Sequence, residues 1–154
     1  MNDEIRAFIE RHRTAALAVC SHEGPVVSMV SYVAEPGAQS VLLHLSNLAP
    51  HKQLLLANPV CGLLIADPDD GRAEPTSLKR LSLSGRAEKI EKGTPAYESA
   101  KARFLARIPA SRLMFDLPDF DLFRVTLTSG RYVGGFGKTI SFQVEQTEQV
   151  GQAE

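Results

Sequence analysis

Hydrophobic and polar residues alternate along most of this chain in short runs typical of β-strands. The clearest run covers residues 80–88, where Leu81, Leu83, Gly85 and Ala87 share one face and polar side chains occupy the other. This pattern predicts a strand that is buried on one side only. Other apolar or β-branched runs predict further strands at residues 15–20, 26–33, 41–45, 60–66, 121–128, 131–133 and 139–144.

Helical patterns are few and short. Three helices are predicted, each with a candidate N-cap residue. The first covers residues 3–13 (cap Asn2 or Asp3), and the third begins at Pro95 (cap Thr94). The second is a short helix capped by Ser46 or Asn47, with Pro50 in its first turn, that stops at Asn58-Pro59. The short connections between the first three strands favour an antiparallel meander. The pattern as a whole predicts a mainly β fold (α+β), an antiparallel barrel of six to seven strands with a few short helices.

Composition narrows the class of protein. The 154 residues suit a single domain, expected at 1–144 with a polar tail at 145–154, and 44% of them are hydrophobic. The net charge of −1 provides no basic field for nucleic acid or an anionic membrane. Neither a spanning segment nor an export signal is found in the sequence, so a cytoplasmic location is expected.

Metal and disulfide chemistry receive little support. Cys20 and Cys61 lie in apolar runs without a CxxC or Cys/His spacing, which predicts free, buried thiols and no metal site. The acidic cluster at Asp67, Asp69 and Asp70 lacks the length and the closing glutamate of a calcium loop. His44 lies within a predicted strand, where a half-buried histidine with satisfied hydrogen bonds is the ordinary interpretation.

The segment 46–52 carries the most suggestive chemistry. It places Ser46, His51 and Lys52 at the start of a predicted helix, where free N–H groups and basic side chains favour an anion such as phosphate. A capped surface helix with solvated polar residues is the alternative. Tyr132 and Phe136 flank glycines, where aromatic rings either plug the end of a barrel or stack on a ligand.

In order along the chain, four stretches resemble the pyridoxamine-phosphate-oxidase-like FMN-binding split barrels, and most of all the haem-utilisation flavoproteins. These stretches are Gly24-Pro25-Val26-Val27-Ser28, residues 45–52 with Asn58-Pro59, residues 80–87, and residues 119–123 leading to 130–137, which contain Gly134-Gly135-Phe136-Gly137.

The resemblance implies a homodimer with FMN bound in clefts between subunits. It places Ser28, Met29 and Val30 along the flavin ring and ribityl chain. The positions around the phosphate, and those that reach or cover the ring, are then Leu45, Ser46, His51, Lys52, Arg80 and Phe136 (or Tyr132). His51 stands where related oxidases have arginine. The resemblance identifies no catalytic residue.

Two departures from the family pattern limit what the resemblance implies. Residues 137–141 replace the Arg-x-His arrangement that holds pyridoxal substrates, and the haem-utilisation relatives usually have a longer chain or a histidine-bearing tail. The expected function is an FMN-dependent oxidoreductase acting on a small molecule. The alternatives are a non-catalytic flavin or haem binding or trafficking module, and a deazaflavin-binding reductase.

Overall fold

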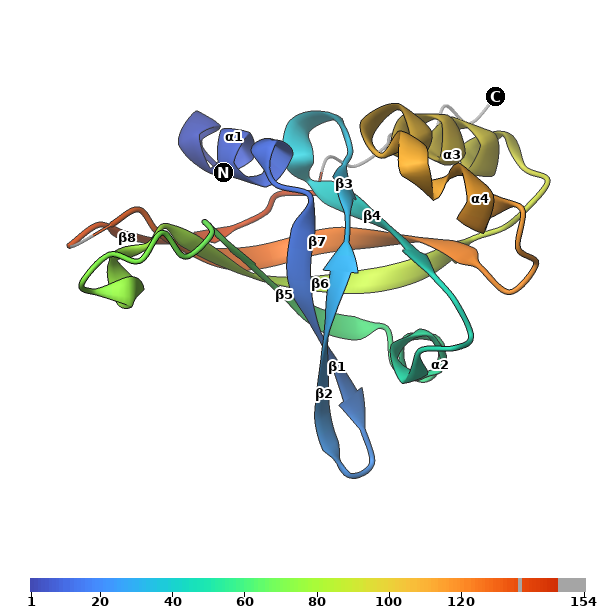
Figure 1. Ribbon diagram of the computed structural model, residues 1–154, viewed down its shortest axis with the longest axis horizontal. Helices are drawn as coiled ribbons and strands as arrows, with labels where there is room; N and C mark the ends of the chain where they lie inside the picture. Colours follow the sequence, from blue (N-terminus) through green and yellow to red (C-terminus); the bar gives the residue numbers. More distant parts are fainter. Residues whose placement is uncertain (136, 147–154) are drawn as a thin grey trace.

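The computed structural model describes residues 1–135 and 137–146, which form one antiparallel sheet with helices at its sides (Figure 1). The strands are β1 (Thr14–Ser21), β2 (Gly24–Ser31), β3 (Val33–Ala34), β4 (Ser40–Leu45), β5 (Val60–Ala66), β6 (Arg80–Ile90), β7 (Asp121–Val133) and β8 (Thr139–Gln143). The helices are α1 (Asp3–Arg11), α2 (Pro50–Ala57), α3 (Pro95–Arg107) and α4 (Arg112–Phe115), with 3₁₀ turns at Pro36–Ala38, Pro75–Ser77 and Pro109–Ser111.

The sheet order is β2-β1-β5-β6-β7-β4-β3, and β8 also pairs with β7. Strand β7 is long enough to pair with β4 through its first half and with β8 through its second half. The sheet curls around a core made by alternate residues of its strands, and Leu81, Leu83 and Ala87 of β6 are buried there as predicted. The mainly β, split-barrel class is therefore confirmed.

The predicted strand 26–33 is in fact two strands that separate at Tyr32. This side chain is fully buried, and its hydroxyl donates to the carbonyl oxygen of Ile9 in α1 at 2.6 Å. The chain turns inward at this point and continues as β3, which pairs with β4. The meander prediction is wrong for the third strand, because β4 pairs with β7 and not with β2.

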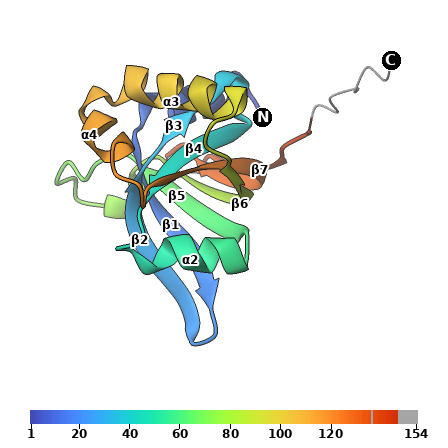
Figure 2. The same cartoon turned by 90° about the vertical axis from the view of Figure 1, so that its right-hand side faces the viewer.

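The helices lie on different sides of the sheet. Helix α1, capped by the Asn2 side chain as predicted, ends at Arg11, two residues earlier than expected, and its apolar face enters the barrel core. Helix α3, capped by Thr94, covers a second apolar cluster that includes Leu42, Tyr97 and Phe104. Figure 2 shows α3 and α4 on one side of the strands and α2 on the other.

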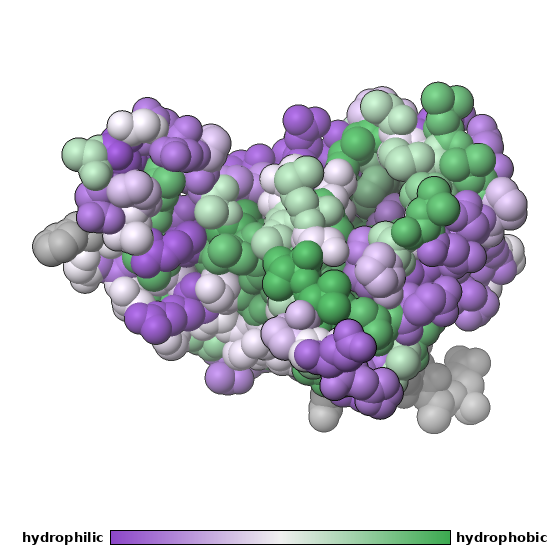
Figure 3. Space-filling model, turned by 60° about the horizontal axis from the view of Figure 1, so that its bottom comes forward, coloured by the Kyte–Doolittle hydropathy of each residue, from purple (hydrophilic) through white to green (hydrophobic). Residues whose placement is uncertain are grey.

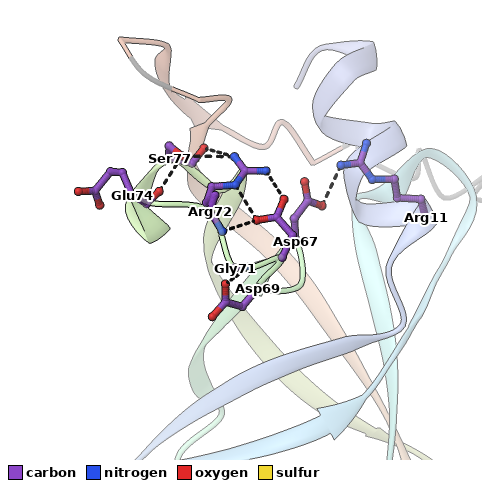
Figure 4. A network of polar contacts seen from close by, with 8 residues as sticks. Arg11, Asp67, Asp69, Gly71, Arg72, Glu74 and Ser77 are labelled. Carbon is purple, nitrogen blue, oxygen red and sulfur yellow. Dashed lines mark hydrogen bonds and ion pairs between the residues drawn. The ribbon is translucent and has the colours of Figure 1, made fainter.

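The acidic loop 67–79 is held by contacts between its own residues and with α1 (Figure 4). Asp70 pairs with Arg72 at 2.7 Å, and Asp67 pairs with Arg11 at 3.0 Å. Asp67 also bonds to His12, whose other ring nitrogen faces the Phe8 carbonyl oxygen. The loop carboxylates thus serve to order the loop.

Both cysteines are free, but they differ in environment. Cys61 is buried, and burial raises the pKa of its thiol to about 11. Cys20 is exposed near the end of β1, contrary to the expectation that both thiols are buried. Among the described residues, no helix is long and apolar enough to cross a bilayer.

Candidate functional site

A cavity of about 230 Å³ opens where β4 ends and α2 begins. Five of the nine residues predicted to bind a cofactor line it: Met29, Val30, Leu45, Ser46 and His51. Residues 104–120, which include α4, supply its other wall, with Phe104, Ile108, Ser111, Met114 and Phe120. The structure therefore brings the core of the predicted site together from segments far apart in the sequence.

The turn between β4 and α2 differs from its prediction. The helix begins at Pro50, later than the predicted caps imply, and its N-cap is Ala49, which makes no side-chain cap hydrogen bond. Ser46 instead accepts a hydrogen bond from the backbone N–H of Leu48 at 3.2 Å. Asn47 accepts from Lys52 at 2.8 Å. The two residues expected to cap the helix therefore make other contacts: Ser46 stabilises the turn before it, and Asn47 binds the Lys52 side chain.

Lys52 is buried, with 3% of its surface exposed. Its Nζ lies 2.6 Å from the Asp121 carboxylate, and it donates to the Asn47 side-chain oxygen and, at 2.7 Å, to the Asp119 carbonyl oxygen. An ammonium group has three protons, and three acceptors surround this one. The residue expected to bind phosphate is therefore fully paired within the chain.

Asp121 forms the other half of this ion pair. Burial alone would raise its pKa, but the hydrogen bond and charge of Lys52, together with the charges of Lys89 and Lys92, outweigh burial and lower the pKa. Lys92 lies 3.6 Å and Lys89 3.9 Å from the carboxylate. The carboxylate is therefore ionised at neutral pH and neutralises the lysine charge at the start of α2.

Two histidines line the cavity without hydrogen-bond partners. Burial lowers the pKa of His51, and no described residue bonds to its Nδ1. Burial, aided by the charge of Lys92, lowers the pKa of His44 to about 4, and both of its ring nitrogens lack partners. The expectation of a satisfied histidine at position 44 is therefore wrong. At neutral pH both imidazoles are uncharged, and nitrogen lone pairs are available on each.

Aromatic rings enclose His44. Its ring stacks on Phe115 of α4 at 3.8 Å between centroids with an interplanar angle of 14°, and Phe104 and Phe120 lie within 6 Å. This aromatic cluster around His44 was not predicted from the sequence. The phenylalanines belong to the region after Thr94, and no local spacing connects them to a histidine on β4.

Two further predicted residues, Ser28 and Arg80, do not line this cavity. Ser28 is on the opposite face of β2 from Met29, beside the buried Leu17. Arg80 borders a different cavity, on the outer face of β6. Phe136 lies outside the described residues. Tyr132, the alternative ring, is buried in the barrel, and its hydroxyl donates to Glu4 at 3.1 Å, so it is a plug of the barrel and not a surface for ligands.

The outer face of β2, β1 and β5 is largely apolar, with Val27, Met29 and Leu64 exposed on it. Met29 pairs with Ala16, Ala16 with Leu64, Val27 with Ala18, and Ala18 with Gly62. Figure 3 shows apolar side chains gathered across the middle of the lower face of the molecule, between polar regions. An exposed apolar surface of this kind marks a place where a ligand or another protein binds.

A curled antiparallel sheet with a cavity between β4, α2 and a covering helical segment is the architecture of the split-barrel class. The chain belongs to the pyridoxamine 5'-phosphate oxidase family, whose model matches residues 1–134.

Its relatives include haem proteins. It is 38% identical to the chloroplast non-canonical haem oxygenase HOZ of Arabidopsis thaliana over 86% of this chain, and spans 40% of that protein. It is 26% identical to the haem oxygenase HutZ of Vibrio cholerae, covering 90% of this chain and 78% of HutZ. A haem-binding protein of Mycobacterium smegmatis superimposes with a TM-score of 0.80 at 27% identity, over 92% of this chain and 57% of that one.

Proposed function

We propose that this protein binds haem at the cavity beside β4 and on the adjoining apolar face of the sheet. The observation that carries the proposal is the internal pairing of Lys52 with Asp121. A flavin phosphate requires a cationic anchor, and the two residues expected to supply it are a neutralised lysine and an uncharged histidine. Haem binds instead to a broad apolar surface, and a neutral imidazole is a common ligand of its iron.

The residues present fit such a group. Met29, Val30 and Leu45 supply apolar contact, and His44 and His51 present unpartnered ring nitrogens that are uncharged at neutral pH. When bound, the iron of a haem supplies oxygen chemistry or electron transfer, according to its ligands. The haem proteins among the relatives support the same proposal.

FMN is the second candidate, because five predicted flavin-binding residues line one cavity and the resemblance to the FMN-binding split barrels implies this cofactor. An FMN-dependent oxidoreductase would take its redox chemistry from the flavin, and the protein would orient the ring. Binding of the phosphate at this site would require Lys52 to release one of its three acceptors.

We also propose that a second copy of this chain closes the site, as the resemblance to the split-barrel family implies. Met29, which lines the cavity, is 81% exposed, and Leu48 and Leu113, each next in sequence to a lining residue, are 92% and 77% exposed. A partner of the same chain would cover them and shield the ligand from water. Sedimentation equilibrium tests this part, with a dimer expected and a monomer at all concentrations contradicting it.

The visible absorption spectrum, recorded before and after addition of haemin, tests the main proposal. We expect a Soret band that saturates at a fixed ratio of haem to chain. A two-band flavin spectrum with release of FMN by acid, and no saturable Soret band, would establish the second candidate instead. If haem binds, a reductant is added to the complex in air. Loss of the Soret band would indicate a haem-degrading enzyme, and a stable band would indicate a storage module.

A further inference from the structure

Two arginines on the outer face of the sheet border a pair of adjoining cavities. Arg80 and Arg131 line a cavity of about 200 Å³ together with Ser82 and Val133. Ser82 and Arg131 also line a second cavity, of about 450 Å³, whose wall includes Ser84, Ser129 and Ser141. Strand register sets this arrangement, because Arg131 of β7 lies opposite both Ser82 of β6 and Ser141 of β8.

Neither arginine has a carboxylate partner within the described part of the chain. Arg80 donates only to the carbonyl oxygens of Thr76 and Leu78. No ion pair or hydrogen bond of the Arg131 side chain occurs among residues 1–135 and 137–146. Two like charges facing one small cavity repel each other, and an anion between them removes the repulsion.

This cluster continues directly from the apolar face described above. Met29, Ala16, Leu64, Ser82 and Arg131 lie in register on five neighbouring strands. Met29 borders the cavity beside β4, and three strand spacings, about 14 Å, separate it from Ser82. The face therefore presents an apolar half followed by a half with hydroxyl and guanidinium groups. A large, flat molecule with an apolar body and an anionic edge matches both halves.

We propose that Arg80 and Arg131, with the Ser82 hydroxyl, bind the oxyanion of this planar ligand. The inference rests on the proposed function, in which the oxyanions are haem carboxylates. The same chemistry would serve the phosphate of a flavin. The anion site then lies on β6 and β7, and not at Lys52, whose protons are already taken. Guanidinium groups suit this role because they bind carboxylate or phosphate through two parallel hydrogen bonds.

The test compares ligands with and without their anionic groups. Haemin and haemin dimethyl ester are titrated into the wild-type protein, Arg131→Ala and Arg86→Ala, with circular dichroism melts as a folding check. Arg86 is the matched control, because it lies on the same face of β6 but outside both cavities, and no described residue pairs with its side chain. We expect Arg131→Ala to weaken haemin binding about tenfold or more and leave ester binding unchanged. Arg86→Ala should change neither affinity.

The outcomes separate the two proposals. If haemin and its ester bind the wild-type protein equally and Arg131→Ala has no effect, the anion site is refuted and haem binding stands. If haemin does not bind, the proposed function fails. The titrations are then repeated with FMN in place of haemin and riboflavin in place of the ester. A selective loss of FMN binding in Arg131→Ala then supports the anion site. An unchanged FMN affinity, or failure of the wild-type protein to bind either anionic ligand, overturns it.

Discussion

Replacing Lys52 by methionine removes a buried charge while preserving most of the side-chain volume. Breaking a buried ion pair from one side typically costs 3–5 kcal/mol. Lys92 and Lys89 remain 3.6 and 3.9 Å from the Asp121 carboxylate and compensate in part, but the Asp119 carbonyl and the Asn47 side chain each lose a charged donor. We therefore expect the free energy of unfolding to fall by about 3 kcal/mol.

Urea unfolding at pH 7 measures this loss, and two further variants control it. Lys89→Met removes a partly exposed charge at 3.9 Å from the same carboxylate and should cost less than about 1 kcal/mol. The double variant Lys52→Met/Asp121→Asn removes both partners and should recover most of the stability. A Lys52→Met protein that is as stable as wild type but no longer binds FMN would refute the structural role and restore the phosphate anchor.

The same pair predicts a pH dependence. The pKa of Asp121 in the folded protein is below the ordinary value of 3.8, so the unfolded chain binds its proton first as the pH falls. The stabilisation is fully present above about pH 5 and is lost as the pH falls through the lowered folded pKa. Unfolding free energies of the wild type measured between pH 6 and pH 3 should fall more steeply than those of the double variant. Parallel curves would contradict the assignment.

Two further predictions concern packing and thiol reactivity. Gly130→Ala would place a methyl group 2.4 Å from the Phe142 ring and should lower the free energy of unfolding by about 1–3 kcal/mol. Gly62→Ala, with no neighbour closer than 3.6 Å, should leave the melting temperature nearly unchanged, and equal melting temperatures of the two variants would contradict this prediction. In native protein at pH 8, Ellman's reagent should modify Cys20 rapidly and Cys61 only after unfolding, because burial raises the pKa of the Cys61 thiol to about 11. Rapid modification of both thiols in the native protein would contradict this prediction.

Local signals were sufficient to place most elements. The alternation in β6 and the caps at Asn2 and Thr94 depend on neighbouring residues, and each appears in the structure. The break at Tyr32 was not predictable in this way, because it depends on a hydrogen bond to Ile9, 23 residues away. The pairing of β4 with β7 has no local signature either.

The candidate site also divides into residues that local motifs identify and contacts that depend on distant parts of the chain. The family resemblance identified Met29, Leu45 and His51, which line one cavity, because the motif marks the turn between β4 and α2. It missed the neutralisation of Lys52, because Asp121 is far along the chain and its approach depends on the register of β4 against β7. It also missed the unpartnered nitrogens of His44, since burial between helix and sheet is a tertiary property.

The strand order has a consequence for synthesis of the protein. Strand β4 is buried on both faces through Val41, Leu42 and Leu43. Apart from the two-residue β3, its only strand partner in the described part of the chain is β7, at residues 121–126. During translation this apolar segment emerges long before its partner does, and the nascent chain carries it unpaired until most of the domain has left the ribosome. Such delayed long-range pairing slows folding and exposes aggregation-prone edges. We therefore expect the growing chain to depend on chaperones until β7 is complete.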